Sequence, residues 1–171
     1  MKLNSILKPL YHPPLLPMPD VPLPNHYGSF MCKRKHDYHG GVDLYCLDGS
    51  PVYAVEDGVV ILVRDYTGEK VGCPWWNETR AVYVEGDTGV ICYGEIQEGE
   101  DIKSGVRVSA GHIIGQVKTV LKKDKGKPMS MLHFALHRHG FKWRVDNDVY
   151  EQHMDPTLLL IQCKINAANV N

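Results

Sequence analysis

Between about residue 38 and residue 136, apolar residues occur in short runs that often alternate with polar ones and are separated by turn-forming residues. Such a pattern favours short β-strands. The clearest turn is Gly86-Asp87-Thr88-Gly89, which separates two runs rich in β-branched and aromatic residues and therefore predicts a β-hairpin. We expect strands near residues 52–55, 59–64, 81–85, 90–94 and 131–136.

Helical patterns are weak by comparison. No long stretch repeats apolar residues at helical spacing before Asp155, and the run from Asp155 to Leu160 predicts one short helical turn with proline in its first position. The segment from Ile102 to Val117 alternates small apolar residues with glycines, which is typical of strands and turns. We therefore expect an all-β fold, a compact sandwich or barrel.

The beginning of the chain differs from the rest because it is rich in proline. Seven of the eleven prolines lie between Pro9 and Pro24. Proline fixes φ and removes a backbone hydrogen-bond donor, so this segment should be extended and irregular. The prolines and Lys8 also interrupt the apolar core that a signal peptide needs, and no apolar run approaches the roughly 20 residues of a membrane span. We expect a cytoplasmic protein with no membrane partner.

Composition narrows the range of functions further. Nineteen basic and twenty acidic residues leave a formal net charge of −1, which gives no general attraction to nucleic acid. Five scattered cysteines with no CxxC pair argue against a disulfide framework or a cysteine-only zinc site. The length of 171 residues fits one domain, and no pattern indicates an oligomeric state.

The candidate chemistry begins with His39-Gly-Gly-Val-Asp43 at the start of an expected strand, together with His133 inside another. A histidine in an apolar strand is often only a core or surface residue. Two neutral imidazoles and one carboxylate can also form a three-ligand zinc site with one open position. Carboxylate in place of thiolate keeps the metal a stronger Lewis acid, which suits hydrolysis more than architecture.

A family resemblance rests on several pieces of the sequence. The motif His39-x-Gly-x-Asp43 is followed from Gly49 to Val60 by the pattern G-x-x-V-x-A-x-x-x-G-x-V, and Leu132-His133-Phe134 and Asp155-Pro156 come later in the matching order. In these features the chain resembles the lysostaphin/LytM-type zinc metalloendopeptidases. The resemblance implies a duplicated-hybrid-motif β-sandwich with a central groove, in which His39, Asp43 and His133 bind zinc. It divides the chain into an extended segment 1–27, a peptidase-like domain 28–160 and a tail 161–171.

The sequence departs from the family pattern at two places. Active members have an HxH and a Y-x-H, whereas this chain has Met131-Leu132-His133 and Tyr93-Gly94-Glu95. The resemblance thus implies that two catalytic histidines are replaced. Glu95 can act as a general base, because glutamate has that role in HExxH peptidases. A groove-facing Tyr93 would donate its O–H to an oxyanion, whereas a core tyrosine would not; methionine can only pack or shield.

A shifted alignment would use His137-Arg138-His139 as the HxH, with His139 as ligand and His137 as catalytic residue. The Leu-His-Phe context and the nearby end of the strand favour His133, so we expect His137 at the rim of the groove as a substrate contact.

Three functions follow from these residues. The first is a zinc endopeptidase that uses Glu95 as base and cuts peptides, either peptidoglycan-derived or intracellular. The second is an inactive zinc-binding relative that binds a peptide or glycan. The third is a carrier or transferase-like module, because the segment from Gly105 to Gly115 is also similar to lipoyl-type domains and to the glucose-specific domain of the sugar phosphotransferases. The chain lacks the lysine in a hairpin tip that the first needs and the paired phosphorylatable histidines that the second needs.

Overall fold

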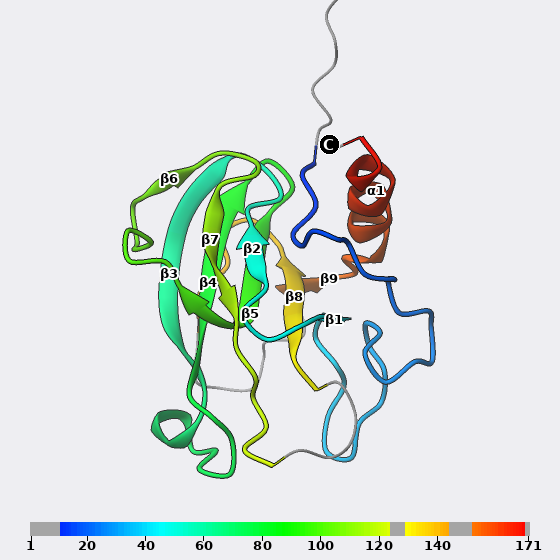
Figure 1. The fold of residues 1–171 in the computed structure, drawn as a ribbon, viewed down its shortest axis with the longest axis vertical. Coiled ribbons are helices and arrows are strands. Elements are labelled where there is room, and N and C mark those ends of the chain that lie inside the picture. The colour runs from blue at the N-terminus through cyan, green and yellow to red at the C-terminus, as the bar shows by residue number, and fades with distance from the viewer. Residues whose placement is uncertain (1–10, 124–128, 144–151, 170–171) are drawn as a thin grey trace, which may run out of the picture.

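The computed structural model describes residues 11–123, 129–143 and 152–169, and Figure 1 shows their fold. It is mostly β, as the alternating pattern predicts, with one short α-helix. The described strands are β1 (Val42–Tyr45), β2 (Pro51–Tyr53), β3 (Gly58–Thr67), β4 (Thr79–Gly86), β5 (Val90–Glu98), β6 (Arg107–Val108), β7 (Ile113–Val117), β8 (Met131–His137) and β9 (His153–Met154). A 3₁₀ turn, η1 (Glu69–Val71), follows β3, and helix α1 (Thr157–Ala167) follows β9. Each of the five expected strands has a counterpart, in β2, β3, β4, β5 and β8.

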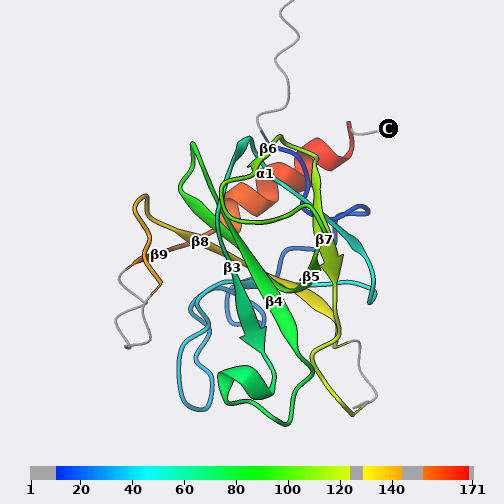
Figure 2. The same cartoon turned by 90° about the vertical axis from the view of Figure 1, so that its left-hand side faces the viewer.

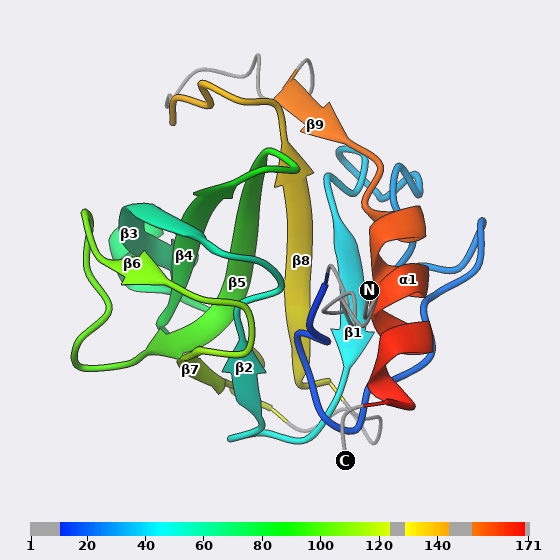
Figure 3. The same cartoon turned by 90° about the horizontal axis from the view of Figure 1, so that it is seen from above.

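The strands pair in the order β1-β8-β5-β4-β3-β6, and all of the described pairings are antiparallel. In Figure 2, β3 and β4 lie side by side along the twisted sheet. Strand β5 pairs with β8 over Val90–Gly94 and with β7 from Ile96 onward, and β7 also pairs with β2. Figures 1 and 3 show β2 and β7 lying against one face of the longer strands.

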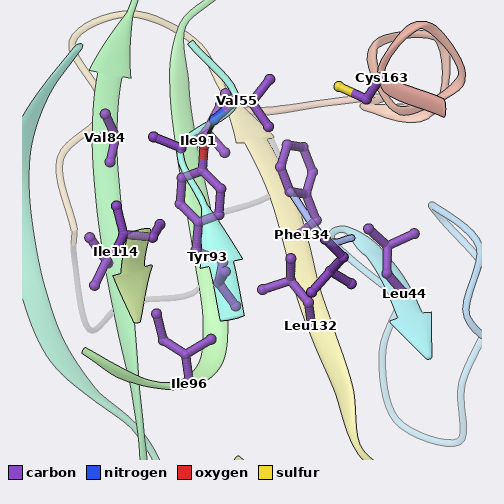
Figure 4. Close-up of a cluster of buried hydrophobic side chains, with 14 of the residues drawn as sticks. Leu44, Val55, Val84, Ile91, Tyr93, Ile96, Ile114, Leu132, Phe134 and Cys163 are labelled. Atoms are coloured by element: carbon purple, nitrogen blue, oxygen red, sulfur yellow. Dashed lines mark hydrogen bonds between the residues drawn. The ribbon is translucent and has the colours of Figure 1, made fainter. Parts of the chain in front are cut away.

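The main core fills the space between these two layers (Figure 4). Because side chains alternate along a strand, every second residue of β8 points into this core, as Leu132, Phe134 and Leu136 do. The intervening residues, among them His133 and His137, therefore lie on the opposite face of the sheet. That opposite face carries a smaller cluster around Tyr83, Cys92 and Phe141.

The described part of the proline-rich segment, from residue 11 onward, has no helix or strand up to residue 32, and residues 1–10 lie outside the described part of the chain. It is nevertheless attached to the domain. The Tyr53 amide donates to the Pro14 carbonyl at 2.9 Å, and Leu15 is buried in the main core. In Figure 1 this segment, in blue, runs beside α1 in red, where the Asn166 side chain donates to the Tyr11 carbonyl at 2.8 Å.

Helix α1 crosses residue 160, where we expected the domain to end and a tail to begin. Leu160 and Cys163 are both fully buried in the main core, so residues 161–167 belong to the packed structure. Among the described residues, no helix is long and apolar enough to cross a membrane.

Candidate metal centre

Three residues meet on the face of the sheet opposite the main core. They are Asp43 from β1, His133 from β8 and His39 from the segment that precedes β1. Strands β1 and β8 pair with Asp43 directly opposite His133, so their side chains are neighbours on one face. His39 lies four residues before Asp43 and is buried. Together the three form a group that could hold a metal ion.

The ligand atoms have spacings that suit zinc. The carboxylate Oδ1 of Asp43 lies 3.0 Å from His39 Nε2 and 3.0 Å from His133 Nδ1, and the two nitrogens are 3.2 Å apart. Zinc bonds of about 2.0–2.2 Å in tetrahedral geometry place ligand atoms roughly 3.4 Å apart. The triangle therefore matches one face of a zinc tetrahedron after a small expansion, and the fourth position is left for water or substrate.

Neighbouring groups fix the direction of each ligand. His39 Nδ1 lies 2.9 Å from the Ser29 carbonyl, which can only accept, so this nitrogen carries a proton and Nε2 is the atom directed at Asp43 and His133, where a metal would replace its proton. Arg34 donates from Nη2 to Asp43 Oδ2 at 2.6 Å and leaves Oδ1 toward the histidines. Burial alone would raise the pKa of Asp43, but hydrogen bonds from His133 and His39 hold it well below its ordinary value.

The second glycine of the His39-Gly-Gly-Val-Asp43 motif has a packing role at this site. A Cβ on Gly41 would lie 2.6 Å from the Phe134 carbonyl oxygen and 2.8 Å from His133 Nε2. Only glycine allows β1 and the His133 ring to approach this closely. Burial also lowers the pKa of His133 and so favours the neutral imidazole that binds metal.

A groove of about 530 Å³ extends from His39 and His133 along this face. Its other lining residues combine ionisable groups with an aromatic wall. They include Arg34, Arg64, Tyr66, Trp76, Tyr83, Glu95, His137, Phe141, Trp143 and His153.

Glu95 reaches this groove because of a β-bulge. Between the Val82–Tyr93 and Arg80–Ile96 pairs, Gly94 and Glu95 of β5 oppose the single residue Ala81. Glu95 has φ +62°, a conformation that is costly for a residue with a side chain. Its Oε2 is buried with no hydrogen-bond partner among the described residues, and burial, with the nearby Asp43 charge, raises its pKa to about 8.

The same bulge separates Glu95 from Tyr93, for which the structure corrects our expectation. Tyr93 is fully buried in the main core, and its hydroxyl accepts a hydrogen bond from the Val55 amide at 2.9 Å (Figure 4). Its O–H therefore points away from the groove and cannot donate to a substrate oxyanion there. In a regular strand residues 93 and 95 would share a face, and the extra residue of the bulge places them on opposite faces.

The expected rim residue His137 does line the groove, although its side chain is buried instead of lying at an open rim. Its ring lies 4.2 Å from the ring of Phe141, centroid to centroid. Burial lowers the pKa of His137 to about 3. His139 lies elsewhere, with Nε2 3.2 Å from the Asp87 carbonyl, so the shifted alignment that made it a ligand is wrong.

His153 is a site residue that the sequence did not predict. Strand β9 places it opposite His137 on β8, and its imidazole lies on the backbone of Gly40 and lines the groove. Burial, with the neighbouring His133 and His39, lowers its pKa to about 4. The only sequence feature that relates to it is the first glycine of the motif, whose purpose is not evident until β9 is in place.

A family comparison agrees with this geometry. The model of peptidase family M23 matches residues 37–147, which is more than half of the chain. The chain belongs to peptidase family M23. Its resident metal is accordingly zinc, for which the group of His39, Asp43 and His133 is suited. No curated protein sequence matches this M23 family member.

Solved structures of similar fold include lysostaphin from Staphylococcus simulans, an antimicrobial peptidase, at a TM-score of 0.60 and 19% identity over 91% of this chain and 55% of lysostaphin. The catalytic domain of lysostaphin alone gives a TM-score of 0.54 and 22% identity over 79% of this chain and 88% of that domain. A zinc-containing peptidase from Vibrio cholerae gives 0.52 and 23% over 72% of this chain and 35% of that protein. The chain thus spans about half of lysostaphin and about a third of the Vibrio peptidase, and these likenesses show the shared fold.

Proposed function

We propose that this M23 family member hydrolyses peptide bonds of cell-wall peptides and that Glu95 is the general base. The observation that carries the proposal is the bulge at Gly94–Glu95, which turns a carboxylate into the metal groove with a strained φ of +62°. Strain of this kind persists where the surrounding structure maintains it and is concentrated at functional sites.

The need for such a base follows from the sequence. Met131 and Glu95 occupy the positions at which the family pattern has its two non-ligand histidines. A thioether cannot accept a proton, so Glu95 is the one of the two that can take part in proton transfer. Zinc, when bound, would supply a Lewis acid that polarises the scissile carbonyl and acidifies water.

The surroundings of Glu95 fit this role. A carboxylate with a pKa near neutrality is a stronger base than an ordinary glutamate, and the pKa of Glu95 is raised to about 8 in the metal-free protein. A cation in the groove would lower that value and keep Glu95 ionised near neutral pH. Arg34 acts in the same direction, because its charge favours the ionised form of Glu95.

The shape of the groove supports a peptide substrate. Trp76, Phe141 and Trp143 form an aromatic wall, and the Arg64 guanidinium stacks on Trp143 with Cζ 3.6 Å from the ring centroid. A wall of this kind can pack against an extended backbone with small side chains, as in the glycine- or alanine-containing peptides of cell walls.

The test is cleavage of pentaglycine and of purified muropeptides by the zinc-loaded protein, followed by mass spectrometry. Glu95→Gln should keep zinc and the fold but lower kcat by roughly 10²–10⁴, the range for loss of a general base. Glu100→Gln, at an exposed position after β5, is the matched control and should retain full activity. Unchanged cleavage by Glu95→Gln would rule out Glu95 as the base.

A second candidate function is a zinc-stabilised module that binds the same peptides without cutting them. Met131 favours it, since one of the family's proton-transfer positions carries an inert side chain. This alternative predicts that wild-type protein binds pentaglycine or muropeptides in calorimetry and cleaves neither. In that case the double variant Met131→His/Glu95→His, which restores the family pattern, should gain activity.

A further inference from the structure

The backbone conformation of Gly40 does not require glycine at this position. Its φ lies outside the left-handed region, so another residue could adopt its backbone conformation. A Cβ at this position would nevertheless lie 2.9 Å from both Cε1 and Nε2 of His153. The family motif HxGxD leaves this position open, so in this chain the missing side chain makes room for one imidazole.

The imidazole of His153 is held firmly in that space. Strand β9 pairs His153 with His137, and their ring centroids are 4.6 Å apart. His137 packs in turn on Phe141 at 4.2 Å. His153 thus lies between this aromatic layer and Gly40, the residue that directly follows the ligand His39 in the sequence. It lines the same groove as Glu95.

This position matches a chemical need of the proposed reaction. When water attacks a peptide carbonyl, an O–C bond forms and the carbonyl oxygen gains negative charge, which a fixed N–H donor stabilises. An ionised glutamate cannot donate, and methionine has no N–H. An imidazole carries at least one N–H in either protonation state, so His153 can donate whether or not it is protonated.

We propose that His153 is a further catalytic residue of this M23 family member, which donates an N–H hydrogen bond to the oxyanion formed at the scissile carbonyl. The proposal rests on the proposed peptidase function. In the step it describes, the water proton passes to Glu95 and then to the leaving amine as the C–N bond breaks. His153 only donates a hydrogen bond and ends the step in the protonation state in which it began.

The first test is kinetic. His153→Phe keeps an aromatic ring against His137 and removes the donor, and it should lower kcat about 10²–10³-fold with little change in KM. Gly40→Ala should displace the imidazole and have a similar effect, and the double variant should be no worse than either single one. His112→Gln, on the turn before β7 and outside the groove lining, is the control.

The second test does not need turnover. Inorganic phosphate, a tetrahedral oxyanion, is titrated into the zinc-loaded protein while the histidine side chains are followed by ¹H–¹⁵N NMR. The His153 N–H resonance should shift on binding, and His153→Phe and Gly40→Ala should each weaken phosphate binding about tenfold or more. Zinc content is measured for every variant, and His153→Gln, which retains a side-chain N–H, should recover part of the affinity.

The two tests separate the inference from the function on which it rests. If no peptide is cleaved but phosphate binding depends on His153, the peptide substrate is wrong and the oxyanion donor stands. Equal phosphate affinity in wild type, His153→Phe and Gly40→Ala, with zinc retained in all three, would overturn the role of His153.

Discussion

The ligand atoms of the metal group are drawn together by hydrogen bonds before zinc arrives. Asp43 Oδ1 lies 3.0 Å from both imidazole nitrogens, and Arg34 occupies Oδ2 at 2.6 Å. The site is therefore preorganised. A zinc ion that bound here would take the place of the protons shared between Asp43 and the two imidazoles, and its three ligands would already lie close together. Each of the three ligands should be indispensable, whereas histidines on the same face that point elsewhere should not be.

His133→Ala should accordingly abolish zinc binding at neutral pH, because two remaining ligands are too few for a stable protein site. His137→Ala should retain one zinc per chain, since His137 packs on Phe141 and contributes no ligand atom to the group. Metal analysis after gel filtration measures both. Zinc loss in His137→Ala with retention in His133→Ala would reverse the assignment.

The raised pKa of Glu95 makes a prediction about stability in the metal-free protein. Glutamate has an ordinary pKa near 4.5, and burial raises it to about 8 in the fold, so the folded state holds this proton more tightly than the unfolded state. The unfolding free energy should therefore fall as pH rises from about 4.5 to 8. Glu95→Gln cannot ionise and should be more stable than wild type at pH 8, by ~2–4 kcal/mol, and equal near pH 4.5.

Urea denaturation in the presence of a chelator measures this difference. His137 and His153, whose pKa values are lowered, make the stability of both proteins rise with pH, so the comparison of the variant with wild type isolates the Glu95 contribution. Glu100→Gln should follow the wild-type curve. A constant offset between wild type and Glu95→Gln at every pH would contradict the buried-carboxylate explanation.

At the scale of the elements, the site depends on irregularities that a pattern of alternation cannot reveal. The spacing of His39, Asp43 and His133 could be recognised because motif and strand are local features of the sequence. The face of Tyr93 could not be predicted, because one extra residue in the β5 bulge reverses the alternation between Tyr93 and Ile96. His153 was missed for a different reason: its position depends on the pairing of β9 with β8, a contact far apart in the sequence from His39.

The contact between β1 and β8 gives an element-level prediction. Gly41→Ala would place a Cβ 2.6 Å from the Phe134 carbonyl oxygen and 2.8 Å from His133 Nε2, so the strands must separate or the ligand ring must move. We expect a loss of about 1–3 kcal/mol in unfolding free energy and at least tenfold weaker zinc binding. Gly99→Ala, whose Cβ would lie 3.3 Å from side-chain atoms of Asp101 and Ile102 and at an ordinary contact distance of 3.8 Å from the Ile114 carbonyl oxygen, should change zinc affinity little. Competition with a zinc chelator dye measures the affinity.

At the scale of the whole molecule, the groove lies on one face of the sheet and the main hydrophobic core lies on the other. The β2–β7 layer, the proline-rich segment and α1 contribute to the main core through Val52, Ile114, Leu15 and Leu160. The proline content predicted an extended first segment, but it did not predict that Leu15 would be buried in the core. The weak helical pattern after Asp155 predicted one short turn followed by a tail and not the helix α1. Both features depend on long-range packing, in which a few apolar residues far apart in the sequence are buried in the same core.

This separation predicts that the fold can be weakened through α1 without loss of the metal site. Leu160 is fully buried in the main core, whereas Leu158, two residues earlier on the same helix, is 80% exposed. Leu160→Ala should therefore reduce the unfolding free energy by about 2–5 kcal/mol through lost burial and a residual cavity, and Leu158→Ala should change it by less than about 0.5 kcal/mol. Both substitutions make the same small change in intrinsic helix propensity, so the difference between their unfolding free energies reports packing. Urea denaturation of the metal-free proteins gives the free energies, and zinc titration of the folded proteins should give the same affinity for both variants. A Leu160→Ala protein as stable as Leu158→Ala would show that α1 does not pack on the core in solution.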